Sequence, residues 1–501
     1  ERMILSISIG FLGISYSSLQ SVLYHAIRIK AIRIIQKERS KMAGGTWTSQ
    51  NKAQPGVYIN TKSQGNIRAN IGTRGIVAIA EPLSWGPSGI VQTIIPGEDL
   101  TPYIGYDITS EKALFLREMM KGSDTTAGPS KILLYRPKGT SGAKATATIG
   151  TLTATAVYDG VRGNDIAIII SADPDEEKTF QVATVVDGSV RDEQTVKTAE
   201  ELVGNVWVVF SGSGELEATA GKKLTGGKDP TVATTDYAAW LTAMEPYKFD
   251  VMVYDGEDKT TIQAVAAFVK RVSNNVGLKC QAVMADASVS NSEWVISVKN
   301  GVKLDDGTVL TPQQATWWLG GAEAGALYNQ SLTYSRYPNA LEACPKLTDA
   351  QIEEAIKAGE IVFIDTFDKV KVCTDINTFT SFAVDKGEEY SKNRVMRVLN
   401  QFCNDVYEHF SNYFIGKVSN DETGRSLLKG WIVGYLNDMQ ANSGVQNFEA
   451  EDVTVEAGNS IDAVLIAVKI QPVDSIEKIF MTVTVSVNVE AESEVVHELF
   501  T

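Results

Sequence analysis

Histidine and cysteine are scarce in this sequence. Its 501 residues include three histidines, namely His25, His409 and His497. So few histidines leave little material for a histidine-based metal site or a Ser–His–Asp triad. The four cysteines lie far apart and form no C-x-x-C pair, at Cys280, Cys344, Cys373 and Cys403. This spacing excludes a disulfide-built scaffold and favours separate thiols in a reducing compartment.

Motifs that bind nucleotides or activate a nucleophile are missing too. No Gly-Lys pair is followed by the serine or threonine of a phosphate-binding loop, and no G-x-S-x-G elbow occurs. The acidic pair Asp255 and Glu257 follows an expected strand, where α/β enzymes place catalytic groups, but no base or phosphate loop accompanies it. We therefore expect no catalytic residue, no cofactor and no metal. An α/β enzyme with a β-rich insertion is the alternative.

The net charge of −15 is unevenly placed. Residues 1–41 hold seven basic and two acidic residues, a net of +5, so the remainder carries −20. An acidic body argues against nucleic-acid binding, which needs a basic surface. Segment 1–41 lacks aspartate, threonine and proline and contains an apolar run at Ile4–Leu23. We interpret it as a non-native upstream extension, with an amphipathic or membrane segment as the alternative. Elsewhere we expect no direct membrane insertion.

An α/β pattern occupies residues 76–140 and 230–365. In the first stretch, strands at Ile76–Ala80 and Lys131–Tyr135 flank a helix over about 111–121, capped by a serine. The second stretch continues the alternation with a helix around Trp240, strands at Phe249–Tyr254 and Lys279–Met284 about a helix at 259–275, a hairpin at Asp306-Gly307, and a helix from Pro312 to Tyr328. This order predicts a largely parallel sheet covered by helices.

Local signals are most consistent near residue 350. Thr348 and Gln351 form a capping box, and Gly359 ends the helix just before a strand at Glu360–Ile364. The helix that starts at Pro312 carries small residues, including Gly321, which let another backbone approach closely.

Residues 141–229 predict an inserted, mainly-β domain. They are rich in Thr, Val, Ala and Gly, and turns are expected at Asp159-Gly160 and Asp187-Gly188. One short helix is expected at 198–204. The expected strands are Thr153–Tyr158, Asp165–Ser171, Phe180–Val186 and Val206–Phe210.

Residues 366–481 predict a C-terminal α+β domain. Helices are expected over about 388–414 and 424–442. An apolar face on the first helix is formed by Val395, Leu399, Phe402, Val406 and Phe410. Strands are expected at Asp452–Val455, Ile461–Gln471 and Ile479–Val489. The whole chain is thus expected to be a multidomain α/β and α+β protein: an α/β core with an inserted mainly-β domain, an α+β C-terminal domain, and extended terminal arms.

Both ends of the body look like separate strands. The N-terminal arm, residues 42–75, is polar and Gly-rich except for Pro55, Gly56, Val57, Tyr58 and Ile59. The C-terminal strand and arm, residues 482–501, carry alternating valines at Val483, Val485, Val487 and Val489. A strand whose backbone groups are unpaired in its own subunit can pair with a strand of another chain. The alternative is that both pair within their own subunit.

These motifs together resemble the contractile phage tail sheath protein family. The run from Pro55 to Tyr58 is similar to the family's N-terminal motif, and the later motifs follow in the family's order and spacing, so the resemblance covers roughly 42–501. Residues 1–41 depart from the pattern. The later motif residues are Gly416, Lys417, Asn420, Gly424, Arg425, Pro472, Glu477 and Lys478.

The resemblance implies a structural subunit rather than an enzyme. It implies hexameric rings stacked helically around an inner tube, arms that add strands to neighbouring C-terminal domains, and contraction that drives the tube through a cell envelope. The implied partners are further copies of the chain, the inner tail tube protein, and baseplate and tail terminator proteins. The implied location is a virion tail or phage-tail-like particle assembled in the bacterial cytoplasm. An infectious phage and a phage-tail-like bacteriocin both fit the sequence.

Overall fold

The computed structural model describes residues 44–45, 57–58, 71–173, 176 and 178–485. The chain divides into two compact units, Glu1–Ile67 and Arg68–Thr501. In the first unit, strand β1 (Gly44–Gly45) pairs in parallel with β2 (Val57–Tyr58). Segment 1–41 and the predicted arm residues Pro55, Gly56 and Ile59 lie outside the described residues.

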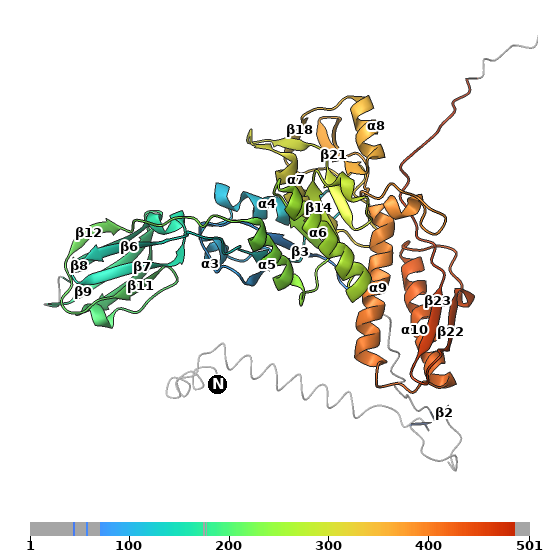
Figure 1. Cartoon of the computed structure of the whole chain (residues 1–501), viewed down its shortest axis with the longest axis horizontal. Helices are drawn as coiled ribbons and strands as arrows, with labels where there is room; N and C mark the ends of the chain where they lie inside the picture. Colours follow the sequence, from blue (N-terminus) through green and yellow to red (C-terminus); the bar gives the residue numbers. More distant parts are fainter. Residues whose placement is uncertain (1–43, 46–56, 59–70, 174–175, 177, 486–501) are drawn as a thin grey trace, which may run out of the picture. The chain divides into compact units, whose positions relative to one another are not determined.

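A seven-stranded sheet organises the second unit (Figure 1). Its strand order is β19-β15-β14-β13-β3-β5-β4, and every neighbouring pair is parallel except β4 with β5. The strands are β3 (Ile76–Ala80), β4 (Val91–Ile94), β5 (Lys131–Tyr135), β13 (Val251–Tyr254), β14 (Gln281–Ala285), β15 (Val295–Val298) and β19 (Glu360–Ile361). The largely parallel sheet predicted from the sequence is confirmed.

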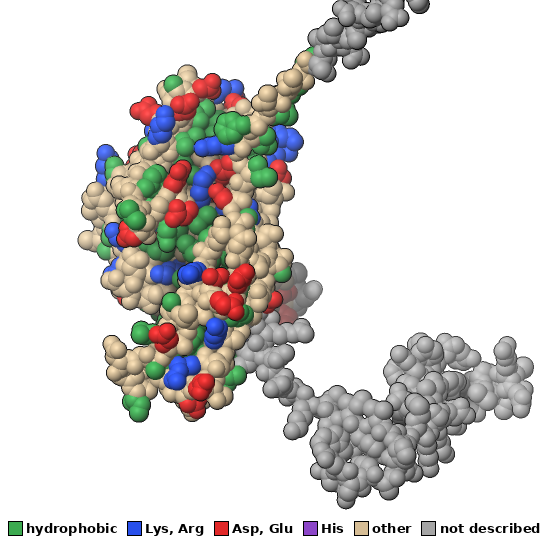
Figure 2. Space-filling model, turned by 90° about the vertical axis from the view of Figure 1, so that its right-hand side faces the viewer, with side chains coloured by type: hydrophobic (Ala, Val, Ile, Leu, Met, Phe, Trp, Pro, Cys, Tyr) green, Lys and Arg blue, Asp and Glu red, His purple; other side chains and the backbone are tan. Residues whose placement is uncertain are grey.

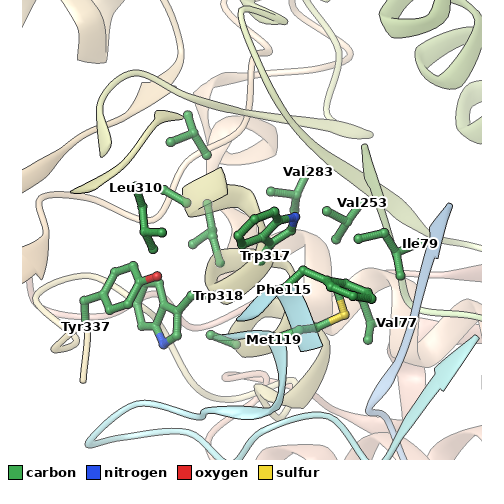
Figure 3. Close-up of a cluster of buried hydrophobic side chains, with 14 of the residues drawn as sticks. Val77, Ile79, Phe115, Met119, Val253, Val283, Leu310, Trp317, Trp318 and Tyr337 are labelled. Carbon is green, nitrogen blue, oxygen red and sulfur yellow. The ribbon is translucent and has the colours of Figure 1, made fainter. Parts of the chain in front are cut away.

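Helices cover both faces of this sheet. One face carries α4 (Leu114–Met120) and α7 (Pro312–Gly325), and the other carries α5 (Thr234–Met244) and α6 (Lys259–Arg271). The faces follow the alternation of a strand, because Val77 and Ile79 belong to the first core and Ala78 and Ala80 to the second. Figure 3 shows part of the first core, which includes Trp317, Phe115, Met119, Val253 and Val283.

Helix starts and contacts follow the local sequence. Ser110 Oγ accepts a hydrogen bond from Lys112 N at 3.2 Å, but the first turn is 3₁₀ (η1, Glu111–Ala113), so the helix predicted over 111–121 divides into η1 and α4. A Cβ on Gly321 would lie 1.9 Å from the Met119 backbone oxygen. A glycine is therefore required where α7 meets the end of α4, as expected.

Smaller elements follow the predicted turns. The hairpin of β16 (Gly301–Leu304) and β17 (Val309–Leu310) turns at Gly307, which has φ +89°. β16 also pairs with β18 (Ala340–Cys344). Helix α8 (Asp349–Lys357) begins with the capping box of Thr348 and Gln351. The strand predicted at 360–364 is divided, because β20 (Phe363–Thr366) leaves the large sheet to pair with β21 (Lys369–Val372).

The inserted segment is a sandwich of two antiparallel sheets around one core. One sheet has the order β10-β9-β8-β12 and the other β11-β7-β6. The strands are β6 (Lys144–Ile149), β7 (Leu152–Asp159), β8 (Ile166–Ala172), β9 (Phe180–Val186), β10 (Ser189–Val196), β11 (Val208–Ser211) and β12 (Thr219–Lys223).

Several details of the sandwich differ from the sequence expectation. One predicted turn is confirmed, because Asp187-Gly188 forms a hairpin turn with φ +53° and +73°. Asp159-Gly160 instead leads through a 3₁₀ turn, η2 (Val161–Asp165), into a strand of the other sheet. The helix expected at 198–204 is a single 3₁₀ turn, η3 (Ala199–Glu201), because a loop to β11 follows at once. β6, β10 and β12 were not predicted, since polar residues alternate through them or glycine interrupts them.

The C-terminal part packs two long helices and a hairpin. It contains α9 (Asn393–Tyr413), α10 (Glu422–Ala441), β22 (Val453–Ala457) and β23 (Val464–Val468). The first predicted helix starts later than expected, because residues before Asn393 form a separate 3₁₀ turn, η6 (Glu388–Ser391). The strand expected from Ile479 is not formed over the described residues 479–485. No helix in the described part of the chain has both the length and the apolar character needed to cross a bilayer.

Candidate assembly interface

Helix α9 buries two different stripes. Phe402, Val406 and Phe410 pack against the core of α10, as their spacing predicted, whereas Leu399 packs against the core beneath α5 and α6. A second, polar stripe was missed from the sequence: Asn393, Arg397, Asn400, Gln401, Asn404 and Asp405 are all buried. Their helical spacing is a signal in the sequence, because polar residues repeated every three to four positions mark a face just as apolar ones do.

Arg397 joins α9 to the α/β part. Its guanidinium pairs with Glu323 of α7 and with Asp375, and the three side chains are at most 1% exposed. Burial acts to raise the pKa of Asp375, but the Arg397 charge holds it below its ordinary value. Burial, helped by Asp375, raises the pKa of Glu323 well above its usual range. Asp375 is therefore the charged partner of Arg397, and Glu323 favours its protonated form.

The same stripe holds the end of the N-terminal arm. Asp405 Oδ2 accepts hydrogen bonds from Gly72 N at 2.8 Å and from the Tyr435 hydroxyl of α10 at 2.6 Å. Gln401 Nε2 donates to the Gly72 carbonyl at 3.2 Å. The last residues of the arm are thus held to α9.

Asn420 connects the turn between α9 and α10 to the β22–β23 hairpin. Its Nδ2 donates to the carbonyls of Ile461 and Ala463, both at 2.9 Å. Arg425 donates to Asn420 Oδ1 at 2.9 Å and so orients the amide. These two predicted motif residues therefore shape the hairpin rather than reach out to a partner.

The glycines of this motif are required by the backbone. Gly416 has φ +72°, and a Cβ on Gly424 would lie 2.0 Å from the Ser419 carbonyl oxygen. Lys417 donates from Nζ to the carbonyl of Asn412 near the end of α9. The motif thus builds a tight connection between the two helices.

The β22–β23 sheet has two strands, and neither outer edge pairs with another described strand. A sheet of two strands is marginal in water unless something covers it, and here the core of α10 covers one face through Val453 and Val468. Next to β23 lies a pocket of about 470 Å³, whose lining includes β23 but not β22. Its apolar lining includes Phe410, Phe414, Leu428, Val464 and Ile466. Ile466 is 37% exposed, so the core of α10 is open on the β23 side.

After β23 the chain returns toward the α/β part. Pro472 forms a bridge with Val445. Glu477 then accepts hydrogen bonds from the hydroxyls of Thr333 at 2.7 Å and Thr374 at 3.3 Å. It also forms an ion pair with Lys392, the residue before α9. Among the motif residues Pro472, Glu477 and Lys478, Glu477 is therefore the one whose side chain ties the segment to the α/β part.

The segment beyond Glu477 is exposed. Ile479 is 81% exposed and Phe480 92%, and the predicted arm residues Val483 and Val485 are 73% and 82% exposed. Val487 and Val489 lie outside the described residues. Figure 2 shows this segment leaving a face on which acidic and basic side chains lie beside one another rather than gathering by sign. The described chain therefore contains an exposed apolar segment that forms no strand in its own subunit. It also contains a two-stranded sheet whose β23 edge pairs with no other described strand.

Family models match almost all of the described second unit. The model of the phage tail sheath protein central domain matches residues 231–378, and that of the phage tail sheath C-terminal domain matches 385–486. The phage tail sheath protein beta-sandwich domain matches 140–229, and the domain III N-terminal region of tail sheath protein Gp18 matches 74–136. The chain belongs to the phage tail sheath protein family.

Individual relatives agree with this assignment. The crystal structure of the sheath tail protein from Desulfitobacterium hafniense is 42% identical, covers 86% of this chain and 100% of that one, and has a TM-score of 0.77. The phage-like element PBSX protein XkdK of Bacillus subtilis (strain 168) is 35% identical over 89% of this chain and 100% of its own length. The anti-feeding prophage helical sheath, solved in the contracted state, shares the fold at 13% identity, with a TM-score of 0.52, 86% of this chain and 99% of that one.

Membership of this family makes the chain a structural component of a phage tail sheath and not an enzyme. The alternative of an α/β enzyme is therefore wrong. Asp255, the acidic residue considered for catalysis, accepts a hydrogen bond from Trp317 Nε1 at 2.7 Å and lies against Glu81. Burial raises the pKa of Glu81 well above its usual range, and Asp255 raises it further. Among the residues that the structure describes, no cluster of three or more His, Cys, Asp or Glu side chains could hold a metal.

Proposed function

We propose that this sheath subunit polymerises as hexameric rings stacked helically around an inner tail tube, and that contraction of the stack drives the tube through a cell envelope. In this proposal the stack ends at a baseplate and at a tail terminator protein, and it assembles in the bacterial cytoplasm. The shared fold with the anti-feeding prophage sheath, a helical sheath in a contracted state, supports the proposal. The energy for contraction lies in contacts between subunits, so no nucleotide site is needed.

Each region has a role in this proposal. The discontinuous α/β domain, 76–140 and 230–365, and the C-terminal domain, 366–481, form the body of each ring. The β-rich domain 141–229 is an attachment to the body of the ring. The arms, 42–75 and 482–501, link neighbouring subunits.

The observation that carries the proposal is the match between the open β23 edge and the unpaired C-terminal segment. Among the described residues no third strand joins the hairpin, and the pocket beside β23 leaves apolar side chains uncovered. The segment from Ile479 to Val485 has exposed apolar side chains and forms no strand in its own subunit. We infer that this segment of one subunit adds to the sheet of a neighbour.

Strand addition would bury one face of the arm. Val483 and Val485 point to the same side of an extended strand, while Thr482 and Thr484 point to the other. Each fully buried valine stabilises the contact by about 1.5 kcal/mol or more. The N-terminal patch Pro55, Gly56, Val57, Tyr58 and Ile59 would supply a second added strand. Its root is held to α9 through Gly72.

A truncation after Met481 tests this proposal. We expect folded subunits with an unchanged cooperative melt, because the removed residues that the structure describes are exposed and make no hydrogen bond or ion pair within their own subunit. We expect no tubes by negative-stain electron microscopy. The double substitution Val483→Asp with Val485→Asp should also abolish tubes, whereas the matched control Thr482→Asp with Thr484→Asp should retain them. Tubes from the truncated chain, or its aggregation as an unfolded protein, would overturn the proposal.

A further inference from the structure

Glu477 is the last described residue that ties the C-terminal segment to the body. Three groups from other parts of the fold converge on its carboxylate, namely the hydroxyls of Thr333 and Thr374 and the ammonium of Lys392, and the nearby Ser475 hydroxyl donates to it at 3.5 Å. Glu477 is 13% exposed and Lys392 21%, so the pair is screened from solvent more than a surface ion pair. From Lys478 to Val485, no described residue makes a hydrogen bond or ion pair with the rest of the subunit.

The contacts of Glu477 continue into the buried network of α9. Thr333 Oγ1, which donates to Glu477, accepts a hydrogen bond from Asp375 N at 2.9 Å. The Asp375 carboxylate in turn pairs with Arg397 and accepts from Asn393 Nδ2 at 2.9 Å. A continuous path of polar contacts therefore runs from the start of the exposed segment to the core between α7 and α9.

We propose that Glu477 is a positioning residue that fixes the point and direction in which the C-terminal arm leaves the subunit. This inference rests on the proposed function, because it assumes that the arm pairs with a neighbouring subunit. The inference adds that strand pairing depends on this fixed attachment point, here called the arm root, as well as on the valines. It also adds that a pulling force on the arm is transmitted to α9 through Thr333 and Asp375.

Register explains why a fixed root matters. Val483 is six residues beyond Glu477, so it lies within about 20 Å of the root. Without the Glu477 contacts, the nearest backbone tie is Val473 N to the Gly444 carbonyl, and the free length increases by four residues. A slip of one residue in an added strand turns every valine to the wrong face. A loose root therefore weakens the contact at each subunit of the polymer.

Substitutions at the root test this inference in the full chain. For Glu477→Ala we expect at least about a tenfold rise in the critical concentration for tube formation, because four more residues of the arm must be ordered at each contact between subunits. The Tm of the free subunit should stay unchanged. Lys478→Ala is the matched control, since the neighbouring Lys478 is exposed and makes no such contacts. Exchanging the charges, Glu477→Lys with Lys392→Glu, should restore most of the assembly lost by Glu477→Lys alone.

The outcomes separate this inference from the proposed function. If truncation after Met481 abolishes tubes but Glu477→Ala assembles normally, the arm functions without a fixed root and the inference is wrong. If Glu477→Ala lowers the Tm in parallel with assembly, and the exchanged pair restores neither, Glu477 has only a structural role and the inference is again wrong. If the truncated chain itself assembles, the proposed function fails first.

Discussion

The β-sandwich and the β22–β23 hairpin are both attached to helical or α/β structure, but only one of them is complete. The two sandwich sheets enclose a shared apolar core, and Trp85 from the α/β part enters it, with ring centroids 5.3 Å from Tyr158 and 5.1 Å from Trp207. The hairpin leaves Ile466 partly exposed and a pocket beside β23 open. Complete burial indicates a region that is stable within one chain, whereas the incomplete burial of the hairpin is what our proposal requires of a region that another chain covers.

The joints beneath the two regions also differ. Arg136 is fully buried at the sandwich joint and donates to the carbonyls of Leu83 and Gly86 at 2.8 and 2.6 Å, with an ion pair to Asp159 at 3.0 Å. The sandwich is therefore attached by several buried contacts. Among the described residues after Val473, the hydrogen bonds and the ion pair that attach the C-terminal arm to the rest of the subunit are those of Glu477.

Trp85→Ala should have the largest effect on subunit stability. It removes an aromatic side chain that joins the α/β part to the sandwich core, so we expect a loss of about 3–5 kcal/mol in the free energy of unfolding. Urea denaturation measures this loss. Phe367→Ala is the control, because that side chain is 92% exposed and should change the free energy little. An equal effect of the two substitutions would show that the sandwich is not anchored through Trp85.

Glu81→Gln, four residues before Trp85, should have a smaller, pH-dependent effect on subunit stability. Because its pKa is raised well above the unfolded value, the folded subunit binds this proton more tightly than the unfolded chain. The associated stability is fully present below about pH 4 and is lost as the pH rises toward the folded pKa. The neutral glutamine removes that loss. At pH 8 the free energy of unfolding should therefore increase by on the order of 1 kcal/mol, and the Tm should rise with it.

The pH profile provides the check on Glu81→Gln. The difference from the unmodified protein should shrink as the pH falls to about 4. Glu257→Gln, an exposed carboxylate close to Asp255, should show no such profile. A destabilised Glu81→Gln variant at pH 8 would contradict the raised pKa of Glu81.

Ile466→Asp should have the smallest effect on the free subunit and a large effect on assembly. Its side chain is partly exposed, so we expect a loss of less than about 1 kcal/mol in unfolding. In the polymer the same position would face an added strand, and a carboxylate buried there would abolish tube formation. Leu465→Asp, on the outward face of β23, is the matched control and should assemble. Failure of both variants would place the contact on the hairpin's outer face instead.

Much of this architecture follows from local sequence. The capping box at Thr348, the turn at Gly307 and the apolar alternation of β3 specify their elements without help from distant residues. The burial of the polar stripe of α9 could not be predicted, because its partners, such as Glu323 and Asp375, lie on other elements that only the fold brings next to it. Glu477 was recognised as part of a family motif, but its role depends on three elements that only the fold brings together.

A reconstruction of assembled tubes by electron cryo-microscopy tests the central claim most directly. We predict that residues 479–485 of each subunit form a strand beside β23 of a neighbour, with Val483 and Val485 over the pocket that Phe410 and Leu428 line. A β23 edge that stays unpaired in the tube, or that pairs with the C-terminal segment of its own subunit, would contradict the account.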